Sequence, residues 1–184
     1  MIKYFFKLMF KVAGWSIDGQ LSKGLKKCVI IVVPHTSFAD FFVGVAVRAI
    51  QGFRASYLVK EELFKFFPLA WFLKKTGGIP IARSGEAKNN VVDSVVNLYH
   101  QRESLILAMA PEGTRRKVEH FKTGFYRIAL GAKVPIIMVA FDFESRVVRY
   151  LEEFEPTGDM KSDMIYIESR MKGYIGKKPE LSFN

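Results

Sequence analysis

The chain has 184 residues, which is the usual length of one domain and is enough to bury a hydrophobic core. Apolar residues make up 49% of the sequence and exclude a disordered protein, and some of the 17 phenylalanines are expected on a surface that meets lipid or an acyl chain. The 28 basic and 18 acidic side chains give a net charge of +10, which predicts an acidic partner: a nucleic acid, an anionic lipid, an acidic carrier protein or a phosphorylated substrate. The single cysteine, Cys28, excludes an internal disulfide and fits a reducing compartment.

Residues 1–25 are expected to form a basic amphipathic segment that associates with a membrane surface. Lysines at every fourth position share one helix face and apolar side chains occupy another. The lysines are Lys3, Lys7 and Lys11, and the apolar residues are Phe6, Met9, Phe10 and Ala13. The segment is too short and too charged to span a bilayer, so an interfacial helix is expected. The alternative is an ordinary helix packed on the domain formed by residues 26–184.

Strand-like and helix-like segments alternate along the rest of the chain. Strands are expected at residues 28–33, 55–59, 78–82, 105–110 and 135–141, and helices at 38–50, 61–75, 87–102, 123–130 and 160–174. Pro68 should interrupt the second of these helices, and Gly131 should end the fourth. This alternation predicts a single α/β domain with a largely parallel sheet flanked by helices. Ligands are then expected beyond the carboxyl ends of the strands.

A histidine and a carboxylate follow the first of these strands. His35 lies just beyond the strand, and Asp40 falls in the first turn of the next helix. An aspartate that accepts a hydrogen bond from one imidazole nitrogen leaves the other nitrogen free to take a proton. The simpler alternative is that Asp40 only caps the helix in a capping box begun by Ser37, with His35 an ordinary loop residue.

Two further segments place basic side chains after predicted strands. Glu112, Gly113, Thr114 and Arg115 form a glycine turn with basic neighbours, and Arg83 ends the strand at 78–82. Exposed backbone N–H groups and a guanidinium fork suit a phosphate. Each segment taken alone fits a solvated turn equally well.

The stretch from Lys60 to Lys75 is dense in aromatic residues with lysines between them. Such a composition suits either a membrane interface or an acyl groove, because amphipathic aromatic segments favour both. A buried helix is the alternative, since apolar density alone does not separate the two cases.

Taken together, these residues resemble the glycerolipid acyltransferases of the lysophosphatidic acid acyltransferase type. That family has a His-x-x-x-x-Asp motif, a glycine-to-arginine segment, a Glu-Gly-Thr-Arg motif and a proline-led apolar strand, in this order. The matching segments are residues 35–40, 77–83, 112–115 and 134–137, and residues 60–63 and 121–124 are similar to two further family segments. The resemblance covers about residues 14–174, and four ordered motifs are much more specific than any one of them.

The resemblance implies an acyltransferase domain in residues 26–184 that moves a fatty acyl group to the free hydroxyl of lysophosphatidic acid or a related lysolipid. His35 would be the base, oriented by Asp40, and the donor would be acyl-CoA or acyl carrier protein. The implied substrate-binding residues are Lys60, Arg83, Glu112, Gly113, Thr114 and Arg115. No metal or other cofactor is implied.

The implied location is peripheral, on the cytoplasmic side of a membrane with anionic lipid. Compact relatives with little chain before the histidine acylate phosphate-free amino-acid lysolipids, so that acceptor stays an alternative, as does a non-catalytic lipid-binding protein of the same fold. A nucleic-acid partner is not expected, because the aromatic residues lie in apolar runs instead of alternating with basic ones.

Overall fold

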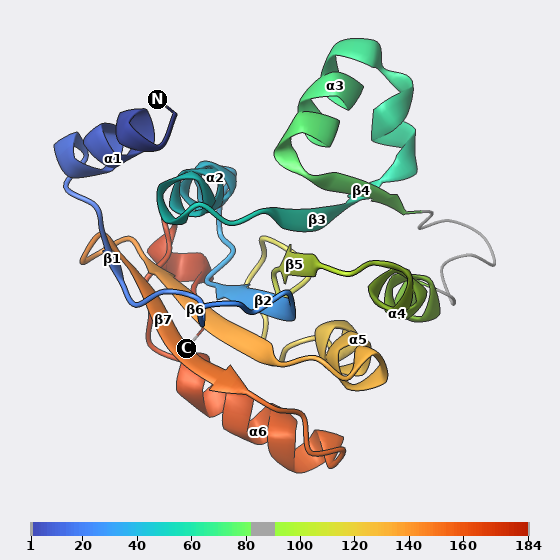
Figure 1. Cartoon of the computed structure of the whole chain (residues 1–184). Coiled ribbons are helices and arrows are strands. Elements are labelled where there is room, and N and C mark those ends of the chain that lie inside the picture. Colours follow the sequence, from blue (N-terminus) through green and yellow to red (C-terminus); the bar gives the residue numbers. More distant parts are fainter. Residues whose placement is uncertain (1, 82–90, 184) are drawn as a thin grey trace.

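The computed structural model describes residues 2–81 and 91–183 and is built on a sheet of seven strands (Figure 1). Their order across the sheet is β1-β7-β6-β2-β5-β3-β4. The strands are β1 (Ser16–Asp18), β2 (Lys27–Val33), β3 (Ala55–Lys60), β4 (Gly78–Ile81), β5 (Leu105–Met109), β6 (Ile136–Asp142) and β7 (Val147–Phe154). The five strands from β6 to β4 are mutually parallel, which confirms the predicted α/β fold with a largely parallel sheet.

Two strands were not predicted from the sequence. β7 returns antiparallel beside β6, and β1 pairs parallel with β7 at the edge of the sheet. β1 lies within the first 25 residues, so part of the expected membrane-associating segment belongs to the sheet.

Helices cover both faces of the sheet. One face carries α1 (Ile2–Val12), α2 (Ala39–Gln51) and α3 (Phe67–Thr76) (Figure 1). A short helix, η1 (Glu61–Lys65), precedes α3. The other face carries α4 (Val91–Gln101), α5 (Gly124–Ala132) and α6 (Met160–Met171). A further short helix, η3 (Pro179–Leu181), lies near the carboxyl terminus. Strand β2 serves both faces: Val29 and Ile31 pack with the α4–α6 layer, and Cys28 and Ile30 pack with the α1–α2 layer. A strand buried on both faces is apolar without interruption, which is why β2 could be predicted from the sequence.

Helix α1 packs on the domain through one of its faces. Phe6 and Phe10 face inward to the core under α2, so these two residues belong to a packed helix and not to a lipid-facing surface. Phe10, only 8% exposed, lies beside Trp15, with ring centroids 5.9 Å apart. The outward side carries a separate apolar stripe of exposed side chains: Ile2, Phe5, Leu8, Met9 and Val12. Among the described residues, no helix is long and apolar enough to cross a bilayer.

The predicted end of the fourth helix was wrong by two residues. Helix α5 continues through Gly131 to Ala132, and Lys133 takes the left-handed cap with a φ of 53°. Gly131 instead allows a close approach to α4, because a Cβ there would lie 3.0 Å from Cγ2 of Val96. The expected break near Pro68 is confirmed: the chain leaves η1 at Phe66, and Pro68 lies in the first turn of α3, where its missing N–H is tolerated.

Candidate active site

The sheet brings the predicted motifs together. Strands β2, β5 and β3 are neighbours and parallel, so their carboxyl ends share one edge. His35 follows β2, Thr114 and Arg115 follow β5, and Lys60 is the last residue of β3. All four line a cavity of about 1300 Å³ that opens at this edge. Arg83, the remaining expected phosphate ligand, lies outside the described residues.

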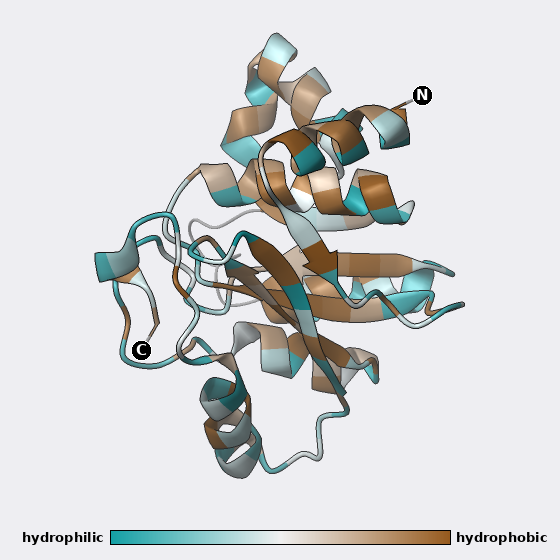
Figure 2. Cartoon of the chain, turned by 90° about the vertical axis from the view of Figure 1, so that its left-hand side faces the viewer, coloured by the Kyte–Doolittle hydropathy of each residue, from teal (hydrophilic) through white to brown (hydrophobic). Residues whose placement is uncertain are grey.

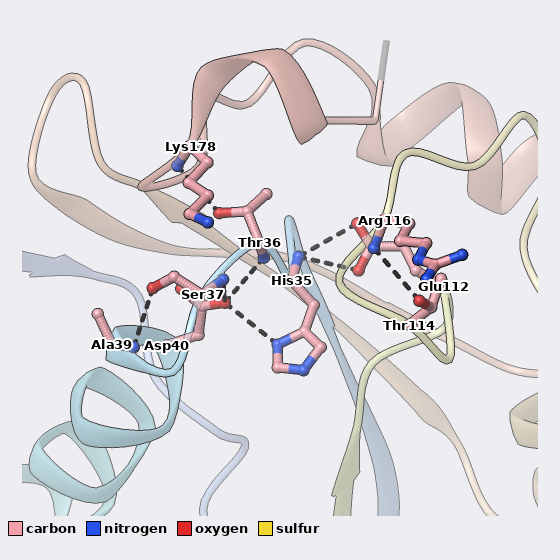
Figure 3. Close-up of polar contacts among 9 residues, drawn as sticks. All are labelled: His35, Thr36, Ser37, Ala39, Asp40, Glu112, Thr114, Arg116 and Lys178. Carbon is pink, nitrogen blue, oxygen red and sulfur yellow. Dashed lines mark hydrogen bonds and ion pairs between the residues drawn. The ribbon is translucent and has the colours of Figure 1, made fainter.

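His35 and Asp40 form a hydrogen-bonded pair at the cavity. Nδ1 of the imidazole lies 3.1 Å from Oδ2 of Asp40, and the second ring nitrogen points away from the carboxylate (Figure 3). Asp40 is 4% exposed and the His35 side chain 28%, so the imidazole can meet a ligand while its partner is shielded. A carboxylate on Nδ1 fixes the tautomer in which Nε2 is free to accept a proton.

Asp40 contacts the main chain of the His35 loop as well as the imidazole ring. Its Oδ2 also accepts the main-chain N–H groups of Thr36 and Ser37, both at 2.9 Å (Figure 3). Asp40 therefore ties together the loop that carries the histidine and orients the ring. Ser37 does not complete a capping box, because its Oγ accepts from the N–H of Ala39.

Glu112 supports the same loop from behind. Its two carboxylate oxygens accept the main-chain N–H of His35 at 2.9 and 3.1 Å, and the residue is 2% exposed. The cavity wall is formed by its neighbours Pro111, Gly113 and Thr114, whereas the Glu112 carboxylate faces the His35 loop. Burial raises the pKa of Glu112 to about 7, partly opposed by the N–H of His35. This geometry favours a supporting role for Glu112 over direct contact with a substrate.

The glycine turn carries exposed cations at the mouth of the cavity. Gly113 has a φ of 64°, so the backbone conformation favours glycine, whereas a Cβ there would meet only the flexible end of the exposed Lys122 side chain. The guanidinium of Arg115 lies over the ring of Phe38, 5.6 Å from its centroid. Lys60, Arg115 and Lys122 are exposed, and together they make the mouth electropositive.

The sequence placed Arg116 in the basic cluster beside the glycine turn, but neither Arg116 nor Lys122 was among the expected substrate-binding residues, and both line the cavity. Each is a basic residue close to the Glu-Gly-Thr-Arg motif, and that proximity is the signal that could have identified them. The inner part of the cavity is apolar and runs beneath α2. Its lining there includes Gly44 and Val47 of that helix and Val139 and Phe141 of β6.

A carboxyl-terminal segment also packs on the His35 loop. Thr36 is 2% exposed, and its Oγ1 accepts the N–H of Lys178 at 3.2 Å (Figure 3). A Cβ on Gly176 would lie 2.6 Å from the same hydroxyl, so the backbone passes as close as a glycine allows. Phe183 anchors the segment against Phe121, with ring centroids 4.2 Å apart.

Within the described ranges, no group of three or more histidine, cysteine, aspartate or glutamate side chains could hold a metal ion.

The chain is similar to known acyltransferases in sequence pattern and in fold. A family model described as Acyltransferase matches residues 17–142, which include His35, Asp40 and the Glu112 to Arg115 motif. The crystal structure of PlsC from Thermotoga maritima, a 1-acyl-sn-glycerophosphate (LPA) acyltransferase, has the same fold: the TM-score is 0.58 at 21% identity, covering 91% of this chain and 74% of that one. No curated protein sequence matches the chain significantly. Since the family model spans more than half of the chain, this protein belongs to the acyltransferase family and is an acyltransferase.

Proposed function

We propose that this acyltransferase moves a fatty acyl group from acyl-CoA or acyl carrier protein to the free hydroxyl of lysophosphatidic acid or a related lysolipid, as a step in membrane lipid synthesis. The observation that carries this proposal is the His35–Asp40 pair at the mouth of a cavity of about 1300 Å³ with an apolar interior. Typical small-molecule pockets measure about 300–1,000 Å³. The larger volume here suits an acyl chain together with an acceptor.

The chemistry follows from the orientation of the imidazole. Nε2 of His35 takes the proton of the acceptor hydroxyl as its oxygen attacks the thioester carbonyl. Collapse of the tetrahedral intermediate breaks the carbon–sulfur bond, and the thiolate leaves with a proton returned by the imidazolium. The negative charge of Asp40 stabilises that imidazolium. General-base catalysis and positioning account for the acceleration, so our proposal includes no metal or other cofactor.

The acceptor phosphate would lie at the electropositive mouth. Lys60 and Arg115 are exposed there, and Thr114 and Gly113 line the same part of the cavity. We include Arg83 in this set on the sequence resemblance. The fold shared with PlsC, which is described as acting on 1-acyl-sn-glycerophosphate, supports a phosphate-bearing acceptor.

The protein would act from the surface of a membrane that contains anionic lipid. The exposed stripe on α1, with Lys3, Lys7 and Lys11 beside it and a net charge of +10, suits an interfacial helix. We place it on the cytoplasmic side because the proposed donors are found there.

A product analysis tests the function. Purified protein would be given palmitoyl-CoA or palmitoyl acyl carrier protein with a panel of lysophosphatidic acid, other lysophospholipids and an amino-acid lysolipid. We expect a diacyl product from lysophosphatidic acid, an activity loss of about 10²–10⁴ in His35→Ala, and full activity in the control His100→Ala, an exposed histidine on α4. Product from the amino-acid lysolipid alone would overturn the phosphate-bearing acceptor, and unchanged turnover in His35→Ala would overturn the mechanism.

A further inference from the structure

The surface beside the cavity mouth is apolar although nothing in the described structure covers it. Five side chains of η1, α3 and the residue that joins them are between 39% and 81% exposed, and we call them the aromatic rim: Leu63, Phe66, Phe67, Trp71 and Phe72. Monomeric soluble proteins rarely expose a contiguous apolar group of this kind without an interaction partner. Figure 2 shows the hydrophobic stretches of the helices on this side of the sheet.

The rim is continuous with the cavity. Leu63 and Phe72 are exposed and also line the cavity. Phe72 contacts Phe41 of α2 at 6.1 Å between ring centroids, and Phe41 stacks on Phe38, which lies under the guanidinium of Arg115. A substrate with a long hydrocarbon chain could therefore pass from the rim to His35 over an uninterrupted apolar surface.

The polar groups of the rim indicate which partner it fits. On α3, Phe67, Trp71 and Lys75 are spaced four residues apart and so share one exposed side, with Lys74 next to them. Tryptophan and lysine at the margin of an apolar helix face are typical of the membrane–water interface. A second copy of this chain fits less well, because a self-complementary contact would bring two lysine clusters and two chains of charge +10 together.

We propose that the aromatic rim is a second membrane-inserting element, separate from α1, that seats the cavity mouth against an anionic lipid surface. This inference rests on the proposed membrane location. It adds that two elements on the same side of the sheet, one on each side of α2, contact the bilayer together (Figure 1). The acceptor would then enter from the lipid phase, while the charged donor would approach from water.

Trp71 reports on this contact directly. The chain has two tryptophans, Trp15 and Trp71, and Trp15 is half-buried against Phe143, so Trp15→Phe leaves a single probe on the rim. The variant would be mixed with phosphatidylcholine vesicles containing phosphatidylglycerol, with and without brominated acyl chains. We expect a blue shift of the Trp71 emission and quenching by bromine. An unchanged emission on vesicles that co-sediment with the protein would overturn the proposal and leave α1 as the proposed anchor.

A pair of substitutions tests the energetic contribution. Phe67→Ser with Trp71→Ser should weaken vesicle partitioning at least about tenfold, because large aromatic surfaces no longer leave water. Both residues lie off the cavity wall, so turnover of a monomeric short-chain lysolipid should persist while turnover of vesicle-embedded acceptor falls. The control is Ile165→Ser, an equally exposed apolar residue on α6 at the opposite face. Equal losses in the control and the test variant would contradict a specific contact.

Sedimentation without lipid separates the remaining alternative. A wild-type dimer that the double substitution converts to a monomer would assign the rim to self-association and overturn the lipid contact. The fluorescence, partitioning and sedimentation measurements do not depend on acyl transfer. A protein whose Trp71 enters the bilayer but which acylates no lysolipid would refute the proposed function alone.

Discussion

The carboxylate of Glu112 holds the main-chain N–H of His35 with both of its oxygens, across 77 positions of sequence. Together with Asp40, which holds the next two N–H groups, it leaves the His35 loop little freedom. The imidazole is thus aimed by contacts to the backbone as well as to the ring. Glu112 of the Glu-Gly-Thr-Arg motif thereby fixes the position of the His-x-x-x-x-Asp motif.

Removing the Glu112 carboxylate should lower turnover without weakening substrate binding. Glu112→Ala leaves the His35 N–H without its acceptor, and the displaced imidazole should reduce kcat about 10- to 100-fold. Glu112→Gln retains one acceptor oxygen and should recover much of that loss. Steady-state kinetics with donor and acceptor varied separately would show KM values close to wild type. A large rise in acceptor KM in both variants would instead make Glu112 a substrate ligand.

The same carboxylate should make stability depend on pH. Because burial raises its pKa from 4.5 to about 7, the folded chain binds more protons than the unfolded chain between these values. Its contribution to the free energy of unfolding is therefore full below pH 4.5 and falls as pH rises to 7, by up to about 3 kcal/mol. Urea unfolding at pH 5 and 8 should show a steeper loss in wild type than in Glu112→Gln. Parallel losses in the two proteins would contradict the raised pKa.

Asp40 can be separated into its two roles by two substitutions. Asp40→Asn keeps an oxygen for the N–H groups of Thr36 and Ser37 but loses the charge, so kcat should fall about 10²–10⁴ with little change in stability. Asp40→Ala also leaves two donors unsatisfied and should cost a further 1–3 kcal/mol or so in unfolding free energy. Thermal unfolding and kinetics of both variants provide the check. An Asn variant with normal turnover would reduce Asp40 to a structural cap.

Arg115→Lys tests the acceptor phosphate. Lysine keeps the charge but not the planar fork, and loss of a two-point contact should raise KM for lysophosphatidic acid about tenfold. Arg127→Lys, an exposed arginine on α5, is the matched control. A rise in donor KM alone would show that Arg115 meets the phosphates of the donor.

The two kinds of side chain on α1 should respond differently to salt. Replacing Lys3, Lys7 and Lys11 with glutamine should weaken binding to anionic vesicles at low ionic strength and have little effect in 0.5 M salt, where charges are screened. Phe5→Ser with Leu8→Ser should weaken binding in both buffers. Deleting the helix is a poorer test, because Phe10 is buried in the core. Vesicle flotation of each variant and of wild type in both buffers is the measurement. If the lysine variant binds as wild type does at low ionic strength, the lysines do not contribute to lipid binding.

The parallel part of the sheet could be predicted from the sequence because strands buried on both faces are continuously apolar, as β2 is. Strand β7 could not be predicted, because it is half-exposed and carries Arg149, Glu152 and Glu153. Strand β1 could not be predicted because it has only three residues. For the site, the order of strands brings His35, Lys60 and Arg115 together, and the sequence motifs indicated this. The inward orientation of Glu112 depends on packing between β2 and β5, and no local pattern encodes it.

The hydrogen bond between Lys178 and Thr36 joins residues 142 positions apart. Ribosomes add roughly 5–20 residues per second, so on the order of ten seconds separate the synthesis of the two partners. In the later part of that interval, after Glu112 has been added, the nascent chain contains His35, Asp40 and Glu112 but lacks the segment that packs against Thr36. The His35 loop therefore gains this support only after all the recognisable motifs have been synthesised, and a chain interrupted just before residue 176 would carry every one of them without that support.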